Sequence, residues 1–414
     1  MNFILASIGV FLVTILLLVV ILLVAKKYLS PSGNVNITIN GDKTISVAQG
    51  GSVLSTLASE GIYLSSACGG KGSCGMCKCQ VDSGAGSILP TETGFFSYKQ
   101  QHENWRLACQ VKVKENIEMR IPESVMGIKK WECTVVSNRN ISTFLKEFVV
   151  KLPEGENLKF KSGGYIQIDV PALDVDFKDM IIDEKYKGDW EKMKMFDLKM
   201  HNPEPTYRAY SMANSPAEGN IIMLNIRIAT PPFDRAAGAF APVNPGICSS
   251  FIFSRKPGDK VTISGPYGEF FLRETNNEMM FIGGGAGMAP MRSHIFNLFH
   301  TIHTDRKVTF WYGARALQEA PYVDEFNKIQ EENPNFHWTL ALDRPDPVAD
   351  AAGVAYKPGF VHQVIFENYL KNHENPEDIE YYLCGPPMMI QAVTKMLYDL
   401  GVPDENVMYD NFGG

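Results

Sequence analysis

The chain has 414 residues and a formal net charge of −7, with 39 lysines and arginines against 46 aspartates and glutamates. This acidic balance, without a basic stripe, argues against a nucleic-acid-binding protein. A chain of this length is too long for one hydrophobic core, so it predicts two or three folded domains, and it contains no internal repeat.

The N-terminal residues 1–25 contain no charged side chain and are followed by Lys26, Lys27 and Tyr28. About 20 apolar residues are enough to span a bilayer as a helix. A cleavable signal peptide would have a basic start and a shorter apolar core, and neither is present. Lysines after the span keep the following chain on the cytoplasmic side. We therefore predict a single transmembrane anchor at residues 1–27 with its N-terminus outside; the alternative is a cleaved or buried apolar helix.

A small mixed sheet is predicted between residues 34 and 127. Residues 35–39 and 44–47 alternate as two strands around Asn40-Gly41, which is a hairpin signal. Residues 52–60 predict a helix with Ser52 as its N-cap and Gly61 as its stop. Residues 107–113 and 117–121 are expected to be strands that close the sheet. A sheet of this kind with one helix resembles the β-grasp ferredoxin fold.

Three cysteines of this domain lie on one glycine-rich loop and a fourth follows after a long gap: Cys68, Cys74, Cys77 and Cys109. The spacing is typical of a plant-type [2Fe-2S] ferredoxin, except that the first gap holds five residues instead of four. Glycines let main-chain N–H groups approach the cluster. A zinc site or a disulfide cage is the alternative, although zinc sites normally add a second close pair of ligands. The cysteines without ligand spacing are predicted to be ordinary thiols: Cys79, Cys133 and Cys248.

From residue 128 to residue 273 the pattern changes to strands separated by turns, at residues 148–152, 165–170 and 221–228 among others, and predicts an antiparallel β-barrel. Within it stands Arg208-Ala-Tyr-Ser. An arginine fork suits a pyrophosphate, a tyrosine ring suits a flavin face, and a serine hydroxyl suits a flavin nitrogen. Residues 245–250, Pro-Gly-Ile-Cys-Ser-Ser, begin an apolar helical stretch and add a second phosphate-type signal. Either motif alone also fits an ordinary barrel.

Residues 171–205 form a long insertion between two barrel strands. The insertion is rich in Asp, Glu and Lys, yet it contains Phe177, Tyr186, Trp190 and Phe196. Connections of this length are uncommon without a purpose. Two hypotheses stay open. In the first the insertion contacts partner subunits, and deleting it impairs assembly but spares the catalytic activity; in the second it is a solvated amphipathic excursion.

Residues 274–414 predict a doubly wound parallel sheet. Buried strands at 279–282, 308–312, 338–342 and 381–384 alternate with helical segments. The first strand runs into Gly283-Gly-Gly-Ala-Gly-Met-Ala-Pro290 and a helix, the order of a dinucleotide cradle, although it departs from the G-x-G-x-x-G fingerprint. A tight structural turn is the alternative. Cys384-Gly-Pro-Pro ends a strand where a nicotinamide ring would lie, although a cysteine there is commonly just a buried thiol.

In this order, Arg-x-Tyr-Ser, Gly-x-Cys-Ser, Gly-Gly-Gly-Ala-Gly-Met-Ala-Pro and Cys-Gly-Pro-Pro-Met resemble the ferredoxin-NAD(P)+ reductase superfamily over residues 130–414. With the anchor, the ferredoxin-like domain and the terminal Tyr409-Asp-Asn-Phe-Gly-Gly, the whole chain resembles the F subunits of bacterial sodium-translocating NADH:quinone oxidoreductases. The five-residue cysteine gap agrees with this family. The implied fold is multidomain, α+β and α/β: a transmembrane helix, a β-grasp ferredoxin domain, an FAD-binding barrel and an NADH-binding parallel sheet.

The resemblance implies a role for each matching residue. The cluster ligands would be Cys68, Cys74, Cys77 and Cys109. FAD would be held by Arg208, Tyr210 and Ser211, with Gly246, Cys248, Ser249 and Ser250 around its phosphates. The nicotinamide site would comprise Gly283, Gly284, Gly285, Ala286, Gly287, Cys384, Gly385 and Pro386. Phe412 would stack on the flavin ring and would have to move for hydride transfer. The residues expected nearest the reacting atoms are Tyr210, Ser211, Cys384 and Phe412, and no general base is expected.

The resemblance also implies the activity. NADH would give a hydride to FAD, which converts the electron pair into single electrons for the [2Fe-2S] cluster, and these would pass to partner subunits in the bacterial inner membrane and on to quinone. Two alternatives have similar domains: a reductase feeding an oxygenase, and a tethered electron carrier without nicotinamide activity. A lone apolar helix offers no ion path, so sodium transport would reside in the partners. Arg315 would suit a 2′-phosphate, so the choice of NADH over NADPH rests on the resemblance.

Overall fold

The computed structural model describes residues 2–29, 33–234 and 238–410, and within these ranges it leaves undescribed the side chains at 2–7, 22–23, 25–29 and 124. The chain divides into two compact units. The first comprises the chain up to Ser66 together with Gly70–Gly127, and the second comprises Ala67–Gly69 and the chain from Ile128 onward.

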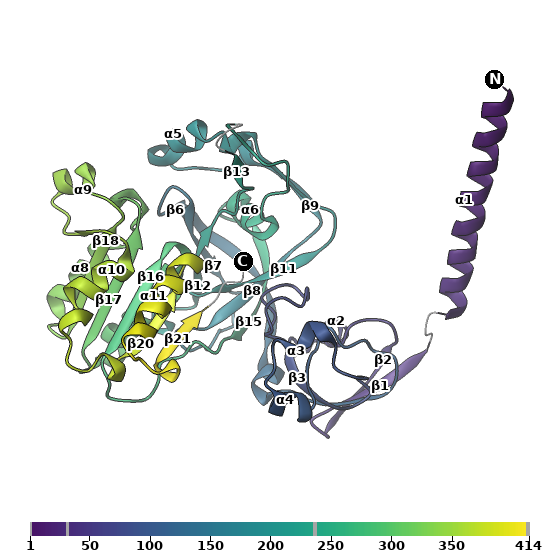
Figure 1. Cartoon of the computed structure of the whole chain (residues 1–414), viewed down its shortest axis with the longest axis horizontal. Helices are drawn as coiled ribbons and strands as arrows, with labels where there is room; N and C mark the ends of the chain where they lie inside the picture. Colours follow the sequence, from purple (N-terminus) through teal and green to yellow (C-terminus); the bar gives the residue numbers. More distant parts are fainter. Residues whose placement is uncertain (1, 30–32, 235–237, 411–414) are drawn as a thin grey trace. The chain divides into compact units, whose positions relative to one another are not determined.

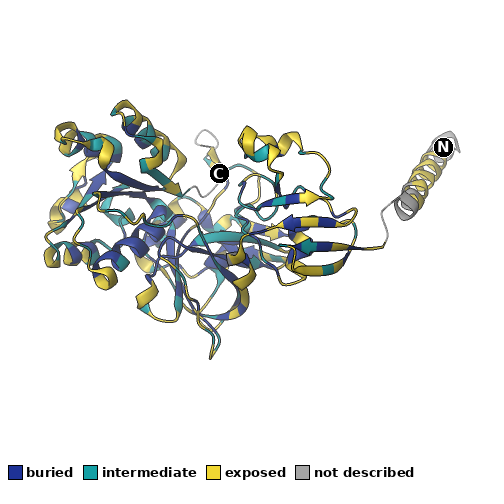
Figure 2. Cartoon of the chain, turned by 90° about the horizontal axis from the view of Figure 1, so that it is seen from below, coloured by how far each residue is buried: buried dark blue, intermediate teal, exposed yellow. Residues whose placement is uncertain are grey.

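The chain begins with a long helix, α1, over Asn2–Leu29. Its described side chains, at residues 8–21 and at Val24, are exposed (Figure 2). Among the residues that the structure describes, none of the helices is both long enough and apolar enough to cross a membrane. The predicted anchor therefore stays a prediction.

A five-stranded mixed sheet forms the first unit, in the order β2-β1-β5-β3-β4. Figure 1 labels β1, β2 and β3 of this sheet, together with α2. β1 buries every second residue, and β1 and β2 pair as the predicted hairpin around Asn40 and Gly41, both of which have positive φ. The predicted helix, α2, is capped by the Ser52 side chain and is followed by Gly61 at φ 76°. The elements are β1 Asn34–Ile39, β2 Lys43–Ala48, α2 Val53–Ser59, β3 Lys78–Ser83, α3 Pro90–Thr93, α4 Tyr98–His102, β4 Trp105–Leu107, β5 Ile117–Arg120 and η1 Glu123–Gly127.

One predicted strand of this unit is wrong. β4 ends at Leu107, and the chain then turns instead of continuing as a strand to residue 113. The Ala108 N–H donates to the Cys77 carbonyl, and the Ala108 carbonyl accepts from the Leu54 N–H. Because the main chain bonds to these two segments, Cys109 lies in a turn just past the edge strand.

The second unit begins with a six-stranded antiparallel sheet in the order β11-β8-β15-β6-β7-β12. Met212, the residue after β11, forms an isolated bridge with Leu224 of β12, so the two edges of the sheet approach each other as in the predicted barrel. The elements are β6 Lys129–Asn140, β7 Leu145–Lys151, β8 Tyr165–Val170, β11 Thr206–Ser211, η4 Pro216–Glu218, β12 Ile221–Arg227, β13 Phe233–Asp234, β14 Ala239–Phe240, α6 Ile247–Ser254 and β15 Lys260–Tyr267.

The insertion at residues 171–205 is folded and contributes to the core of this domain. Phe177 and Trp190 are fully buried, Tyr186 is nearly so, and Phe196 packs against the same core. The Trp190 indole N–H donates to the Thr143 carbonyl at 2.7 Å. Because its aromatic side chains fill the core, the hypothesis of a solvated excursion is wrong, and these rings are not available to a partner. Deleting the insertion is expected to unfold the domain, not to spare its activity. The elements are β9 Leu173–Asp176, η2 Phe177–Asp179, α5 Glu184–Lys192, η3 Met195–Asp197 and β10 Lys199–Asn202.

The last part of the chain is a six-stranded parallel sheet in the order β19-β18-β17-β16-β20-β21. Helices α7 and α8 contribute to the core on one face, and α10 and α11 to the core on the other, as a doubly wound fold requires. Successive strands are added on one side of β16 and then on the other, so the switch point lies between β16 and β20, where ligands bind in such folds.

The sheet elements of this part are β16 Met279–Gly284, β17 Val308–Ala314, β18 Phe336–Leu342, β19 Lys357–Pro358, β20 Glu380–Cys384 and β21 Val407–Asp410. The helical elements are η5 Gly285–Gly287, α7 Met288–Asn297, η6 Leu298–Ile302, η7 Leu317–Glu319, α8 Val323–Glu332, α9 Pro347–Ala352, α10 Val361–Asn368, η8 Leu370–Asn372, η9 Pro376–Asp378, α11 Pro387–Asp399 and η10 Asp404–Asn406.

Candidate functional site

The cysteine loop between α2 and β3 depends on its glycines. Gly69, Gly70, Gly72 and Gly75 all have φ between 67° and 82°, a conformation that other residues rarely adopt. A Cβ on Gly72 would lie 2.5 Å from the Gln110 amide nitrogen, and a Cβ on Gly75 would lie 2.4 Å from the Phe95 ring. The loop therefore follows a path that only glycine allows at these positions.

The four predicted cluster ligands differ in exposure. Cys68 and Cys74 are half-buried, and Cys77 and Cys109 are buried. A hydrogen bond with Cys109, together with burial, raises the pKa of the Cys77 thiol, which places these two side chains next to each other. Across the residues that the structure describes, no three His, Cys, Asp or Glu side chains are grouped so as to hold a metal ion. Four cysteines are nevertheless the donor set of a [2Fe-2S] cluster, which divides them between two irons.

A buried ion pair holds the strand that leads to Cys109. The Glu92 side chain is fully buried, and its carboxylate accepts from the Arg106 guanidinium at 2.8 Å and from the Leu107 N–H at 2.8 Å. Arg106 also donates to two main-chain carbonyls. Sequence reasoning missed this pair, because a lone glutamate and a lone arginine 14 residues apart carry no pattern.

The predicted flavin motif lies on β11, an outer strand of the antiparallel sheet. Arg208 and Tyr210 are half-buried, and Ser211 is buried. Arg208 donates to the Tyr207 carbonyl at 2.7 Å. Burial raises the pKa of the Tyr210 hydroxyl well above its ordinary value, and the nearby Cys248 adds to the effect. The Tyr210 side chain is therefore neutral at physiological pH and lies near α6.

The predicted phosphate segment forms the start of α6. A Cβ on Gly246 would lie 2.5 Å from the Ala229 Cβ, so the chain needs a glycine there. The Ser249 hydroxyl donates to the Gly246 carbonyl and accepts from the Ala229 N–H, each at 3.1 Å. The Ser250 hydroxyl is buried and has no hydrogen-bond partner among the described residues. An unpaired buried hydroxyl at a helix start fits a phosphate group, so Ser250 is the better candidate of the two serines.

The glycine turn after β16 lies against the end of β20. Gly283 pairs with Cys384 in the sheet. A Cβ on Gly287 would lie 2.0 Å from the Cys384 carbonyl oxygen, and a Cβ on Gly385 would lie 3.0 Å from the Gly284 carbonyl oxygen. These glycines are required for close approach, and they bring the two predicted nicotinamide motifs together at the switch point of the sheet.

Ser211 of the flavin motif reaches the same place. Its hydroxyl donates to the Asp410 carboxylate at 2.7 Å, and Asp410 pairs with Cys384 in the sheet. Burial raises the pKa of the Asp410 carboxyl, and the Ser211 hydrogen bond partly offsets the rise. Burial and the Asp410 charge raise the pKa of the Cys384 thiol. Ser211, Asp410 and Cys384, from three separate segments, thus lie next to one another. Phe412 lies outside the residues that the structure describes.

Three domain families match the chain. The 2Fe-2S iron-sulfur cluster binding domain matches residues 37–114, the oxidoreductase FAD-binding domain matches residues 193–272, and the oxidoreductase NAD-binding domain matches residues 281–395. Proteins named as the F subunit of Na(+)-translocating NADH-quinone reductase are similar over the full length. The one from Methylococcus capsulatus is 53% identical over 98% of both chains, and the one from Actinobacillus succinogenes is 54% identical over 100% of this chain and 99% of its own.

The chain belongs to the family of F subunits of Na(+)-translocating NADH-quinone reductases. A member from Pseudomonas aeruginosa is 52% identical over 99% of this chain and 98% of its own. Among solved structures, the Amycolatopsis cytochrome P450 reductase GcoB covers 91% of this chain and 98% of its own at 23% identity, with a TM-score of 0.61. The ferredoxin reductase in carbazole 1,9a-dioxygenase covers 92% and 98% at 24% identity, with a TM-score of 0.58. These two likenesses establish the reductase fold.

Sequence reasoning also missed Asp410 as a site residue. Asp410 lies two positions before Phe412, which is predicted to stack on the flavin. This closeness in sequence was the one feature that could have indicated Asp410 as a site residue. A single aspartate near a chain end is normally a solvated residue. Only its position on β21, beside β20, shows that it faces Ser211.

Proposed function

We propose that the chain is the NADH-oxidising, electron-entry subunit of a sodium-translocating NADH:quinone reductase. The observation that carries this function is identity above 50% with F subunits of such reductases over nearly the whole length of both chains. The matches to the [2Fe-2S], FAD-binding and NAD-binding domain families supply a binding domain for each carrier in the transfer of electrons from NADH through FAD to the cluster. NADH, FAD and a [2Fe-2S] cluster are therefore its cofactors.

The bound flavin supplies two-electron chemistry toward NADH and one-electron chemistry toward the cluster. The residues of the chain hold, orient and shield the reacting groups. Arg208 and Tyr210 would hold the flavin, Ser250 and the start of α6 would bind its phosphates, and the turn at Gly285–Gly287 would admit the nicotinamide dinucleotide.

Ser211 and Asp410 act as a pair in this proposal. Because the Ser211 hydroxyl donates to Asp410, its oxygen is left able to accept a hydrogen bond from a ligand N–H. Buried Cys384 keeps a neutral thiol beside them, since burial raises its pKa, and it adds a small, water-excluding surface for the ring. Hydride transfer requires a protein to orient the two rings and to exclude water, and it requires no general base.

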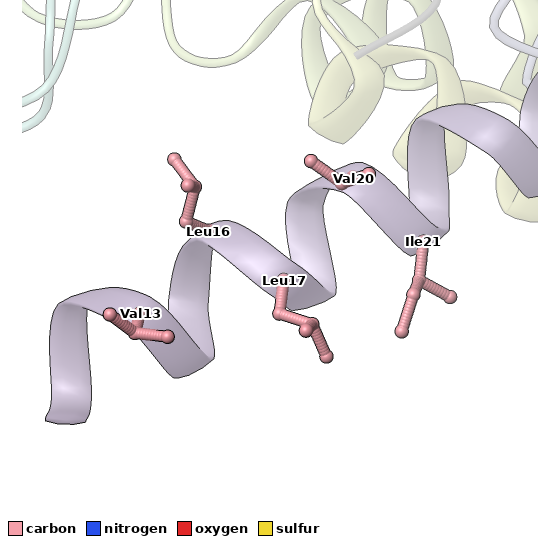
Figure 3. Close-up of a pocket in the computed structure, with 5 residues that line it drawn as sticks. All are labelled: Val13, Leu16, Leu17, Val20 and Ile21. Atoms are coloured by element: carbon pink, nitrogen blue, oxygen red, sulfur yellow. The ribbon is translucent and has the colours of Figure 1, made fainter.

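The membrane attachment is part of the proposal. Residues 1–25 carry no charge, and the described side chains of α1 are exposed and almost all apolar. Figure 3 shows five of them projecting from one stretch of the helix: Val13, Leu16, Leu17, Val20 and Ile21. Aliphatic side chains without a polar partner suit lipid or other apolar helices better than a polar ligand. We therefore propose a single-pass anchor in the bacterial inner membrane, with the catalytic domains on the cytoplasmic side and membrane subunits as partners.

An anaerobic titration of the full-length protein with NADH tests the electron path. We expect the flavin absorbance to bleach and the electron paramagnetic resonance signal of a reduced [2Fe-2S] cluster to follow. Absence of flavin bleaching would exclude NADH oxidation. Bleaching with a cluster that stays oxidised would contradict transfer within the chain. Extraction of the full chain and of a chain that starts at residue 34 from membranes tests the anchor, because only the full chain should need detergent.

A further inference from the structure

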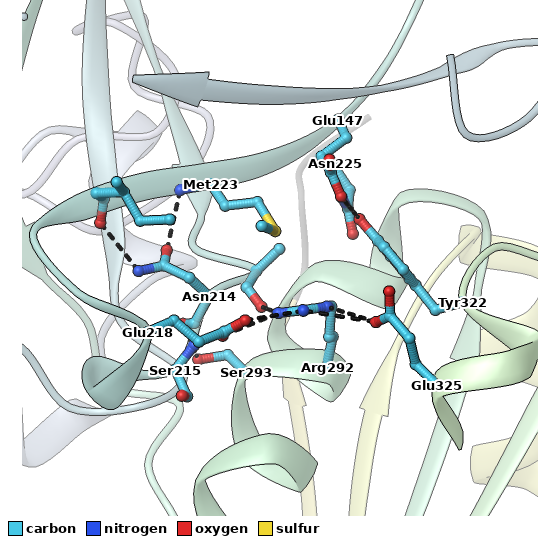
Figure 4. A network of polar contacts seen from close by, with 12 residues as sticks. Glu147, Asn214, Ser215, Glu218, Met223, Asn225, Arg292, Ser293, Tyr322 and Glu325 are labelled. Carbon is cyan, nitrogen blue, oxygen red and sulfur yellow. Dashed lines mark hydrogen bonds and ion pairs between the residues drawn. The ribbon is translucent and has the colours of Figure 1, made fainter. Parts of the chain in front are cut away.

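The described part of the second unit contains a buried arginine that neither the predicted motifs nor the proposed electron path uses. Arg292 lies on α7, five residues after Gly287, and is 5% exposed. Its guanidinium donates to the Glu218 carboxylate through two nitrogens, at 2.8 and 2.9 Å, and to the Ala213 carbonyl at 3.0 Å (Figure 4). This two-point geometry fixes both distance and orientation, which a single charge does not.

The neighbouring residue adds a second contact of the same kind. The Ser293 hydroxyl donates to the Asn214 carbonyl at 2.8 Å. Ala213 and Asn214 are the second and third residues after Ser211 of the flavin motif. The Asn214 side chain in turn bonds to the Met223 N–H at 2.9 Å, which secures the segment to β12. The helix that follows the glycine turn is thus bonded directly to the chain that follows the flavin motif.

Aromatic rings hold the guanidinium in place. Arg292 stacks 3.9 Å from the centre of the Phe296 ring and 5.1 Å from that of Tyr322. The Tyr322 hydroxyl donates to Glu147 on β7 at 2.8 Å and accepts from Asn225 on β12 at 2.7 Å. Figure 4 shows Tyr322 of the parallel-sheet domain reaching Glu147 and Asn225 of the antiparallel sheet, next to Arg292. These contacts fix the position of the Arg292 side chain between α7 and the antiparallel sheet.

A buried charge of this kind is costly, and a hydrophobic side chain of similar size would often be at least as stable. What the arginine adds is a defined geometry between two segments. We propose that Arg292, through Glu218 and Ala213, is a positioning residue for hydride transfer, setting the register between the flavin segment at Ser211 and the glycine turn at Gly283–Gly287. The inference rests on the proposed function, because it assigns the nicotinamide to the turn and the flavin to the Ser211 segment.

The test is pre-steady-state flavin reduction in full-length protein carrying Arg292→Lys or Glu218→Gln, with rates expressed per bound FAD. A lysine keeps the charge but cannot reproduce the two-point contact. We expect flavin reduction at saturating NADH to slow about 10- to 100-fold, as displacements near 1 Å do, while the NADH concentration for half-maximal rate changes less than about threefold. The absorbance band of stacked nicotinamide and flavin should weaken in parallel.

The matched control is Arg306→Lys. Arg306 forms a comparably buried pair with Glu380 at 2.7 Å, but its other bonds go to the Asn277 and Arg273 carbonyls and not to the flavin segment. We expect this variant to lower the melting temperature about as much as Arg292→Lys while leaving the rate of flavin reduction within about twofold of the wild type.

Other results overturn the inference. A wild-type rate in Arg292→Lys would do so, as would equal slowing in Arg306→Lys, which would mean that lost stability alone reduces the rate. If Arg292→Lys does not fold, Glu218→Gln is the deciding variant, because it keeps the arginine. A wild-type rate of flavin reduction in Glu218→Gln would overturn the proposal. Failure of the wild-type protein to be reduced by NADH would instead overturn the proposed function, so the two failures are distinguishable.

Discussion

The cysteine loop and the reductase site are built in opposite ways. Three of the four predicted cluster ligands lie between Cys68 and Cys77, on one loop. The reductase site joins Ser211 to Asp410, 199 residues further along the chain, beside Cys384. The loop depends on local backbone conformation, whereas the reductase site depends on the order of strands in a sheet. A short motif can therefore reveal the first site, but only part of the second.

Glycine shows the same contrast within one residue type. Gly70 of the cysteine loop is required because its φ is positive, at 82°, while a Cβ there would meet no atom closer than 3.5 Å. Gly287 has an ordinary φ of −61°, and it is required because a Cβ would collide with the Cys384 carbonyl. The first requirement belongs to the loop itself. The second exists only because β20 comes to lie beside β16.

The largest effect is expected from breaking the local site. Replacing Cys77 by Ser removes a predicted cluster ligand, and we expect the signal of the reduced cluster to vanish while NADH still bleaches the flavin. Quinone reduction by the assembled complex should fall more than about 100-fold. Cys79→Ser is the control, because Cys79 is buried two residues away and is not a predicted ligand. Electron paramagnetic resonance decides, and a lost signal in Cys79→Ser with a retained one in Cys77→Ser would reverse the assignment.

The next effect tests how the chain around Cys109 is held. Glu92→Ala leaves the Arg106 charge buried and unpaired, so the free energy of unfolding should fall by about 3–5 kcal/mol. The control is Asp82→Ala, whose partner Arg120 is 56% exposed, and it should cost less than about 1 kcal/mol. Urea unfolding followed by cluster absorbance measures both. Equal losses in the two variants would show that the buried pair does not hold this strand.

A smaller effect concerns the choice of coenzyme. Asp343 follows β18 at the carboxyl edge of the sheet, where hydrogen bonds from Arg344 lower the pKa of its carboxyl and the Arg315 charge contributes. A carboxylate there favours a ribose hydroxyl over a 2′-phosphate. We expect Asp343→Asn to raise kcat/KM for NADPH about tenfold, with the value for NADH within about threefold. Glu331→Gln, on the exposed side of α8, is the control. Steady-state kinetics with NADH and NADPH measure kcat/KM for both variants. Equal values for NADPH in the two variants would show that Asp343 does not select the coenzyme.

The smallest effect is a pH dependence of the assembled site. Burial raises the pKa of Asp410, so the folded chain binds a proton there more strongly than the unfolded chain does. Stability from this proton is present at low pH and is lost as pH rises through the raised pKa. Relative to the wild type, Asp410→Asn should therefore gain stability as pH increases from about 4 toward neutrality. Thermal unfolding across this range measures the difference, and a pH-independent difference would show that Asp410 is not desolvated.

Sequence reasoning predicted most of the first unit, because its signals are local. The hairpin at Asn40-Gly41 and the helix capped by Ser52 were confirmed. The strand predicted to continue through Cys109 was wrong, since the main chain of that segment bonds to α2 and to Cys77 instead. The insertion was misjudged for a related reason: charge density indicates a solvated surface, and only the fold shows that Phe177 and Trp190 complete the core.

The sequence by itself determined the motifs whose chemistry depends on neighbouring residues: the cysteine spacing, the glycine turn after β16 and the Arg208-Ala-Tyr-Ser strand. Only the tertiary structure decided which distant side chains join them. Asp410 meets Ser211, Glu92 meets Arg106, and Arg292 meets Glu218. Each is a common residue without a distinctive neighbourhood in the sequence. Its function comes from burial beside one partner, and burial is a property of the packed fold and not of the local chain.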